Sequence, residues 1–598
     1  MPGPPIYKIH PAIGVARVGN APAPDYFIGP ERLGAFEKDS VSPPKYTNDK
    51  GEIRRQAARF RIWKYVDNGS GYVPDKEITA DTSGVLQIVW TVHLANRKAS
   101  FHQFRGLSGS PWVIDGSTDA APLRNLWQGD AAELEFDPGP QSIASDSLLP
   151  VDVGKDTKPA DRPWPTTVPA ITSLGQLRTD VLGRLIVIGG AGISGSLKGV
   201  PLDSKETFNH DRWFDDVSDG PVTAEIEMRV DGVVRQVPVS GAWVLVGPPR
   251  FAPGIPPFID LYQALVTVCA LRVRPQKDDG SYQPGGAMSW FREVQDEVFT
   301  PRGKEVAIKP FKTFRPSFDR DILPVLRSMT LVGAVVPEAR VKHAAQTGDA
   351  ESTARIWKLW SDPTQPNDAR RLIFARIRPL FPSIRPKGLP AVDGRLMPAQ
   401  LGDTYAGDEF YGFASMPYAA YRMFERWAAG EFIGPAIDDP KRLFEPFVST
   451  GKVTPHELDE APLRAALGGS LYPGIETSWL IRYAGLYEEP FRIRHDAPSP
   501  YDYETGPTPV GAGYFTRQLA IPWQADFLSC SETTLPSGPH AGETWWWWPS
   551  HRPDWIPLKK GTSEEWVPNC ATRDEFVLEK WHTAKFVVPK AAGVMEEQ

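Results

Sequence analysis

The side chains best suited to chemistry gather near the C-terminal end of the chain. A carboxylate and a thiol, Asp526 and Cys530, lie four residues apart. Four consecutive tryptophans follow at 545–548, and a further indole next to an imidazole, Trp581 and His582, precedes an apolar stretch. Few proteins place so many indoles beside a thiol and a carboxylate without using them. The pattern predicts an active site built from aromatic, acidic and thiol side chains.

A metal centre is one alternative for this region. His540, His551 and His582 share it with Cys530 and Cys570. Zinc sites usually take their ligands from close pairs such as CxxC or HxxxH, and no such pair is present here. We therefore expect no metal.

Two further alternatives stay open on these residues. Cys530 could act as a nucleophile activated by His551 or His582, although that chemistry leaves the density of tryptophans unexplained. The tryptophans at 545–548 could stack on sugar rings, because aromatic faces bind apolar ring surfaces. They could also alternate between core and surface in a strand.

A glycine string, Gly190, Gly192 and Gly195, has the GxGxxG spacing of dinucleotide-binding loops. It follows the strand-like segment 185–188, but such a site needs a helix to begin at the string so that backbone amides face the pyrophosphate. Pro201 follows closely and no amphipathic pattern is present. The string favours a glycine-rich turn at a strand end, so NAD is not expected.

Bulk composition excludes other classes of protein. The 598 residues are 41% hydrophobic and 23% charged, as in ordinary globular proteins. A net charge of −7 without a basic cluster argues against nucleic-acid binding. No apolar stretch reaches the roughly 18 residues of a membrane span, and no secretory signal is visible. We expect no membrane partner, and a location in the cytoplasm or export without a recognisable signal peptide.

Both helices and strands must position the candidate residues, and the sequence predicts an α+β fold. We expect a β-rich region at 1–310, a mainly helical region at 311–470 and a loop- and strand-rich, tryptophan-rich region at 471–598 that carries the cofactor, all within one catalytic unit. Apolar and β-branched segments bounded by Gly, Pro or Asp predict strands. These segments are 6–9, 85–92, 185–188, 225–230 and 243–246.

In the helical region, Ser317 is a typical helix start, and Pro324 should interrupt any long helix there. Gly430 is a typical C-terminal stop. Cys269, in an apolar run, is expected to be an inert core residue. An aromatic stripe with a spacing of three residues, more typical of packing than of ligand binding, consists of Tyr418, Tyr421, Phe424 and Trp427.

A series of short motifs runs along nearly the whole chain. The motifs are IGVARVGN at 13–20, YFIGPE at 26–31, RQAARFR at 55–61, WTVHLAN at 90–96, WFDDVSDGPV at 213–222, VGPP at 246–249, GG at 468–469, YPGIE at 472–476 and PWQADFLSC at 522–530. In content and order this series resembles the cysteine tryptophylquinone (CTQ)-dependent amino-acid oxidases, the family of lysine ε-oxidase and glycine oxidase.

The resemblance implies a cofactor made from the chain itself. In that family a cysteine sulfur is bonded to the indole of a tryptophan that carries two oxygens as an o-quinone. By motif position the cysteine is Cys530, and the tryptophan is identified as Trp581, with those at 545–548 as alternatives. Asp526 matches the acid needed for cofactor formation and proton transfer, and His582 or His551 is a secondary candidate.

The implied activity is oxidation of a primary amine of a free amino acid by O2, giving an aldehyde or oxo acid, NH3 and H2O2. Side chains lack a good electrophile, so this reaction needs a carbonyl cofactor. Burial among tryptophans should raise the pKa of Asp526, which suits a proton acceptor near neutral pH. Arg552 and Arg517 are candidates for binding the substrate carboxylate, and Phe214 for lining the access route.

By resemblance alone, a separate flavoprotein modifies the tryptophan and the protein forms a homo-oligomer. A narrow pocket would favour glycine as the substrate, and a long one with an acidic end would favour the side-chain amine of lysine. Two other functions remain open. One is a family member without the cofactor that acts as a binding or scaffold protein, and the other is a carbohydrate-binding protein that uses its tryptophans.

Overall fold

The computed structural model gives the fold of most of the chain. It describes residues 2–33, 45–101, 124–125, 134–154, 171–196, 201–202, 210–272, 288, 290–291, 310–336, 339, 350–379, 396–398, 414–445, 452–468, 475–497, 510–529, 532–534, 544–546, 551, 553, 555–559, 562–565, 579–591 and 594–598. Within these ranges, no helix has the length and apolar character needed to cross a bilayer.

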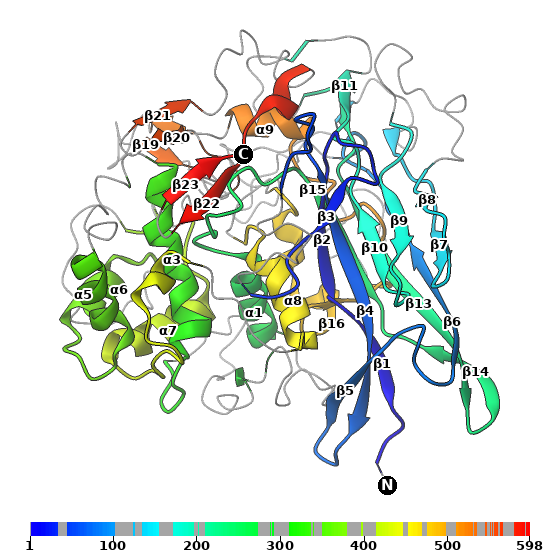
Figure 1. Ribbon diagram of the computed structural model, residues 1–598, viewed down its shortest axis with the longest axis horizontal. Coiled ribbons are helices and arrows are strands. Elements are labelled where there is room, and N and C mark those ends of the chain that lie inside the picture. Colours follow the sequence, from blue (N-terminus) through cyan, green and yellow to red (C-terminus); the bar gives the residue numbers. More distant parts are fainter. Residues whose placement is uncertain are drawn as a thin grey trace, which may run out of the picture.

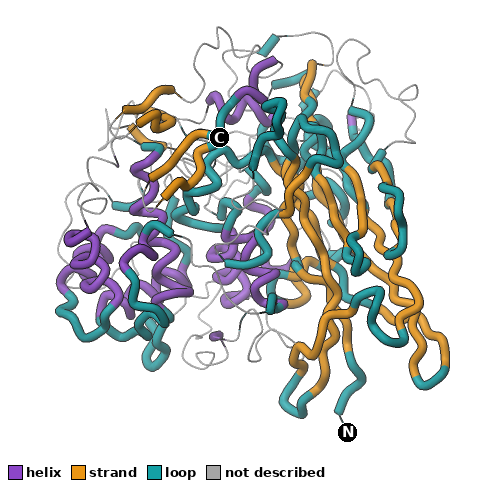
Figure 2. Tube along the Cα trace, in the orientation of Figure 1, coloured by secondary structure: helices purple, strands orange, loops and turns teal. Residues whose placement is uncertain are grey.

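A sheet of 13 strands dominates the N-terminal half (Figures 1 and 2). Its strands are β1 (Ile6–His10), β2 (Ile13–Arg17), β3 (Tyr26–Ile28), β4 (Arg55–Asp67), β5 (Tyr72–Ile78), β6 (Val85–Val92), β7 (Gln141–Ala144), β8 (Val151–Asp152), β9 (Gln176–Thr179), β10 (Leu185–Ile188), β13 (Ser218–Val230), β14 (Val233–Pro238) and β15 (Ala242–Gly247). The strand order is β7-β6-β13-β15-β2-β4-β10-β9-β8, with β1, β3 and β5 added at β4 and β14 at β13. Most pairs are antiparallel, whereas β15 with β2 and β3 with β4 are parallel.

The strand predictions are confirmed. The segments 6–9, 85–92, 185–188, 225–230 and 243–246 lie in β1, β6, β10, β13 and β15. In β13 the side chains of Ile226 and Met228 are buried, whereas Glu225 and Arg229 are exposed, as expected where successive side chains of a strand point to opposite faces.

Helices follow the sheet in sequence and lie to one side of it (Figure 2). They are α1 (Leu261–Arg272), α3 (Leu323–Leu331), α5 (Ala350–Ser361), α6 (Asp368–Arg376), α7 (Tyr418–Ala429) and α8 (Pro455–Arg464). Helix α8 packs against β2, and α1 packs against both α7 and α8. Helices α1 and α8 therefore lie between the sheet and the outer helices (Figure 1). An α+β fold is confirmed, while the proposed division at 310 and 470 stays a prediction.

The prediction that Pro324 interrupts the helix beginning at Ser317 is wrong. The side chain of Ser317 accepts the amide of Arg320 at the start of a π-helical turn, Phe318–Ile322, which continues into α3. Pro324 does not interrupt the helix: it is the second residue of α3, at the point where the π-helical turn passes into the α-helix.

The predictions for the aromatic stripe, for Gly430 and for the burial of Cys269 are confirmed. The four residues of the aromatic stripe lie in α7 and are all buried. That helix ends at Gly430, whose φ of 84° is in the left-handed region. Cys269 is buried within α1, and burial raises the pKa of its thiol to about 12.

The C-terminal part combines short hairpins with one short helix. The hairpins are β16 (Tyr487–Glu489) with β17 (Arg492–Ile493), β18 (Glu532–Thr534) with β19 (Thr544–Trp546), β20 (Trp555–Lys559) with β21 (Thr562–Glu565), and β22 (Val587–Ala591) with β23 (Val594–Glu597). Helix α9 (Trp523–Ser529) lies near the end of the sheet where β15 finishes (Figure 1).

The central strands are buried on both faces. In β15, Trp243 and Leu245 belong to the core shared with the helices. Val244 and Val246, which alternate with them, belong to a second core that also contains Trp581. The sheet therefore separates a helical core from a core formed with the C-terminal segment, and the candidate site belongs to the latter.

Candidate active site

Trp581 is buried against helix α9. It opens a 3₁₀ turn, Trp581–Thr583, and is 5% exposed. Its ring meets that of Trp523 edge to face, with the centroids 5.1 Å apart, an arrangement that aromatic pairs prefer. Trp523 is the first residue of α9, and the helix ends at Ser529, one residue before Cys530. The helix that leads to the candidate cysteine thus packs on the candidate tryptophan.

Several sequence-based candidates fall only partly within the described residues. Asp526 lies in α9, but its side chain is outside the described part, as are Cys530 and Arg552. His582 is half-buried, with its ring centroid 5.9 Å from that of Trp581. Among the alternative indoles, 545 and 546 lie in β19 without described side chains, and 547 and 548 lie outside. The roles of these residues stay predictions.

The start of α9 is held by a buried ion pair. One carboxylate oxygen of Asp215, Oδ2, accepts the backbone amide of Trp523 at 2.9 Å and lies 2.5 Å from Nζ of Lys98. Both charged side chains are 0% exposed. A carboxylate at a helix N-terminus also interacts favourably with the helix dipole. Asp215 therefore anchors the helix that carries Asp526.

Phe214, expected to line the access route, is fully buried. It lies in β12 (Trp213–Asp215), which pairs with β11 (Ser194–Ser196) through the partners Phe214 and Gly195. Its role at an access route stays a prediction.

The glycine string forms a loop that leads into β11, so no helix begins there. Gly192 has a φ of 76°, and a Cβ atom at this position would lie 2.4 Å from Cη2 and 2.5 Å from Cζ2 of Trp581. Its carbonyl accepts Nε2 of Gln524 from α9 at 3.4 Å, and Ser194 Oγ donates to Oε1 of the same glutamine at 2.6 Å. The loop therefore packs closely beside Trp581 and is hydrogen-bonded to α9, neither of which the sequence pattern indicates.

Asp216 is a second residue that sequence reasoning missed. It is 0% exposed, and its Oδ2 accepts the amide of Gly192 at 2.8 Å. Burial raises the pKa of this carboxyl group to about 7, with a further increase from the adjacent Asp215, against the lowering effect of the Ile193 and Gly192 amides and of Arg55. A carboxyl group that titrates near neutral pH thus lies one loop away from Trp581.

His551 belongs to a buried polar network. Its Nε2 lies 2.5 Å from Oε1 of Glu476, and Nη2 of Arg17 lies 2.6 Å from the same oxygen. Burial lowers the pKa of His551 to about 4, so the imidazole is neutral and donates to the carboxylate. Burial alone would raise the pKa of Glu476, but His551 and Arg17 hold it well below its usual range. The carbonyl of His551 accepts the amide of Phe251, which joins this network to the site's aromatic core.

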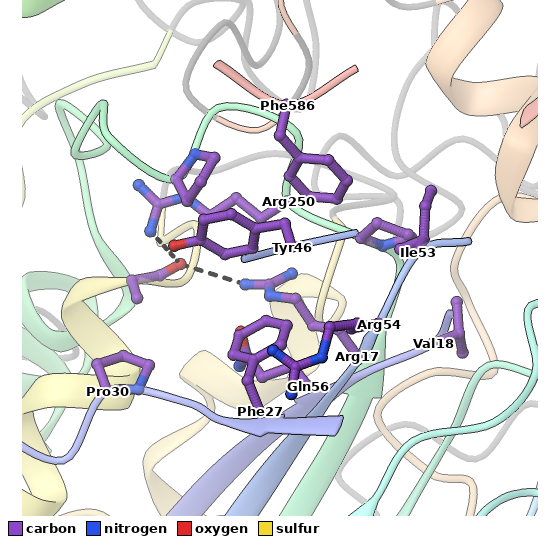
Figure 3. Close-up of a pocket in the computed structure, with 13 residues that line it drawn as sticks. Arg17, Val18, Phe27, Pro30, Tyr46, Ile53, Arg54, Gln56, Arg250 and Phe586 are labelled. Carbon is purple, nitrogen blue, oxygen red and sulfur yellow. Dashed lines mark hydrogen bonds between the residues drawn. The ribbon is translucent and has the colours of Figure 1, made fainter. Parts of the chain in front are cut away.

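A pocket adjoins this network (Figure 3). Arg17 and Arg250 both donate to the carbonyl oxygen of Ala465, at 3.2 and 3.0 Å. On the apolar side Phe586 stacks on Tyr46, with the ring centroids 5.1 Å apart.

The pocket and α9 are separated by aromatic rings. Phe251 contacts Phe586, which lines the pocket, and also Phe527 of α9, at centroid distances of 5.0 and 5.7 Å. Arg517, a candidate for the substrate carboxylate, is 9% exposed and stacks over the rings of Phe101 and Tyr514, 4.1 Å from each centroid. Its role stays a prediction.

Within the described ranges, no three His, Cys, Asp or Glu side chains gather as metal ligands would. His540, Cys530 and Cys570 lie outside those ranges, so the expectation of no metal is not tested.

Comparisons with known proteins identify the family. A family model described as L-Lysine epsilon oxidase N-terminal matches residues 10–246, and one described as L-lysine epsilon oxidase C-terminal domain matches residues 398–548. The L-lysine 6-oxidase of Marinomonas mediterranea is 28% identical over 578 residues, which cover 88% of this chain and 71% of that protein.

Solved structures from the same organism share the fold. The Schiff base intermediate of L-Lys epsilon-oxidase with L-Lys matches with a TM-score of 0.73 at 23% identity, covering 99% of this chain and 94% of that one. A second structure, of the epsilon-lysine oxidase, matches with a TM-score of 0.72 at 22% identity over the same shares. The two family models together span well over half of the chain and include the segment with Cys530. The chain therefore belongs to the L-lysine epsilon-oxidase family, as its motifs predicted, and is an oxidase.

Proposed function

We propose that this oxidase acts on a primary amine of a free amino acid, using a cysteine tryptophylquinone made from Cys530 and Trp581. The products would be an aldehyde or oxo acid, NH3 and H2O2. The observation that carries the proposal is the packing of Trp523 on Trp581, because it brings the helix that ends one residue before Cys530 against this indole. The family membership supports the same chemistry.

The residues around Trp581 fit such a group. The indole is enclosed by Trp523 and by the backbone of Gly192, where a side chain would collide with two ring carbons. A quinone at this position would supply the electrophilic carbonyl that ordinary side chains lack. The buried rings exclude water, and the helix–loop contacts fix the orientation of the indole, so its reactive edge is held in place before substrate arrives.

The other roles rest on the sequence resemblance. Asp526, on the same helix as Trp523, would accept and return the proton of the amine-bearing carbon, with His582 next to Trp581 as a second candidate. Arg552 or Arg517 would bind the substrate carboxylate. Because His551 is neutral and bonded to Glu476, it would act by supporting the surrounding structure.

For the substrate we propose lysine or glycine, the two amino acids named by the family's known activities. A relative of this chain is an L-lysine 6-oxidase, which favours the side-chain amine of lysine. A flavoprotein that modifies the tryptophan and self-association into a homo-oligomer complete the proposal. The protein would work in the cytoplasm, or after export without a recognisable signal peptide.

Intact mass spectrometry tests the cofactor directly. Two oxygens gained and four hydrogens lost would add about 28 Da to the sequence mass and colour the protein. Co-expression with the maturation flavoprotein should give this shift in the wild type, whereas Cys530→Ala and Trp581→Phe should each lack it. Peroxide release on a panel of amino acids then identifies the substrate. A wild type that keeps its sequence mass after co-expression, and releases no peroxide, would refute the proposal and favour a cofactor-less binding protein.

A further inference from the structure

The segment at 190–193 touches both elements that the proposed cofactor would join. Gly192 faces Trp581, and its carbonyl accepts a hydrogen bond from Gln524 of α9. The ring carbons Cζ2 and Cη2 that it faces are bonded to each other, and an o-quinone requires such a pair of adjacent ring carbons. Any side chain at position 192 would cover this edge of the indole.

Asp216 is hydrogen-bonded to the backbone of that segment. Its Oδ2 accepts the amide of Gly192 at 2.8 Å, and the amide of Ile193 also donates to the carboxyl group. The backbone closes around the carboxyl group so tightly that a Cβ atom on Gly190 would lie 2.6 Å from Oδ2. Two successive amides that donate to one carboxyl group fix the backbone of the loop at that point.

The other oxygen of Asp216 is unused. Across the part of the chain that the structure describes, Oδ1 has no hydrogen-bond partner, although the residue is 0% exposed. A buried acceptor without a partner destabilises the fold. If position 216 served only for packing, an amide or an apolar side chain there would be more stable. Asp219, another buried carboxylate nearby, shows the contrast, because its two oxygens accept from Thr516, Phe515 and Trp243.

We propose that Asp216 is a positioning residue for Trp581, acting through the loop at 190–193. Its carboxyl group holds the loop beside the Cζ2–Cη2 edge of the indole, and glycine at position 192 keeps a side chain from colliding with that edge. This inference rests on the proposed function, because it assigns a role to residues around the indole that would become the cofactor.

The test compares variants of the full-length protein co-expressed with the maturation flavoprotein. Asp216→Ala removes both loop bonds and should lower the fraction of protein with the added mass by about tenfold or more, given two lost bonds to a carboxyl group. Asp216→Asn retains an oxygen that can accept from the loop, so it should recover most of the modification but shift the visible absorption maximum. Gly192→Ala should abolish the modification.

Two controls separate positioning from general damage. Gly232 has a φ of 79° with no atom within 4 Å of a Cβ, so Gly232→Ala imposes the same backbone strain far from Trp581 and should mature normally. Asp219→Asn perturbs a buried carboxylate with no bond to the loop and should also mature normally if it folds.

The inference is overturned if Asp216→Ala and Asp216→Asn both mature like the wild type with an unchanged spectrum. It is also overturned if Asp219→Asn loses the modification to the same degree. If Asp216→Ala fails to fold, the visible spectrum of Asp216→Asn tests the inference: a shifted absorption maximum supports it and an unchanged one overturns it. A wild type that never gains the added mass refutes the proposed function itself, which is a distinct outcome.

Discussion

Glu476→Gln should be among the most destabilising conservative substitutions in the protein. The carboxylate is 0% exposed and neutralises Arg17, which is itself 3% exposed, at 2.6 Å. Glutamine keeps the shape and one oxygen that can accept from Arg17, but it leaves the guanidinium charge buried without a counter-charge, and its NH2 group would face the backbone amide of Leu467, which now donates to Oε2 of Glu476. Removing one partner of a buried ion pair costs about 3–5 kcal/mol, because the other charge stays buried without compensation.

Arg17→Met should cost less, and its cost should depend on pH. It leaves Glu476 with His551, whose imidazole can take up a proton once the positive charge of Arg17 no longer opposes this. The pKa of His551 therefore rises above its wild-type value of about 4, so lowering the pH through the unfolded-state value of about 6.5 destabilises the variant less than it destabilises the wild type. The deficit of Arg17→Met should shrink between pH 8 and about pH 5.5, while that of Glu476→Gln persists.

Urea unfolding of both single variants and the double variant, at the two pH values, measures these differences. The pair formed by Arg54 and Asp25 is a matched control, since it has a similar distance of 2.7 Å but is partly exposed. Asp25→Asn should cost less than about 1 kcal/mol. The reasoning is wrong if Glu476→Gln costs no more than Asp25→Asn, or if the deficit of Arg17→Met is the same at both pH values.

Three further predictions follow from the buried groups around Trp581. Lys98→Met leaves Asp215 without its cation and should cost about 3–5 kcal/mol, and adding Asp215→Asn should restore part of this loss in urea unfolding. The pKa of Asp216 is higher in the folded state, about 7, than in the unfolded chain. Wild type should therefore lose up to about 4 kcal/mol of stability as the pH rises from about 4 to above 7. Asp216→Asn should lack this slope when unfolding is followed across that range. Trp523→Ala removes the ring that packs on Trp581 and should cost about 3–5 kcal/mol, with a reduced mass shift on maturation.

Much of the fold could be predicted because the local signals agree with the final structure. The β-branched segments are strands of the central sheet, and the aromatic stripe of α7 is buried. Pro324 was misjudged because its effect depends on which turn of a helix it occupies, and the sequence does not give that turn. The proline lies where the π-helical turn passes into α3, a transition that the sequence pattern does not indicate.

The candidate site was predictable only where its residues are close in sequence or carry a family motif. Asp526 and Cys530 form such a motif, and family membership is confirmed. The contacts of Gly192 with Trp581 and of Asp216 with the loop join segments far apart in the chain, and no periodicity encodes them. The glycine string was recognised as a turn, but its partner could be found only from the folded arrangement.

The two neighbouring carboxylates at the end of β12 accept hydrogen bonds from two different parts of the chain. Asp215 holds the first residue of α9, and Asp216 holds the loop at 190–193. A single inserted or deleted residue at this point would reverse the directions in which they face, because side chains alternate along an extended chain. Helix and loop would then lose their anchors together. The length of this short connection should therefore be under stricter control than the identity of most residues in it.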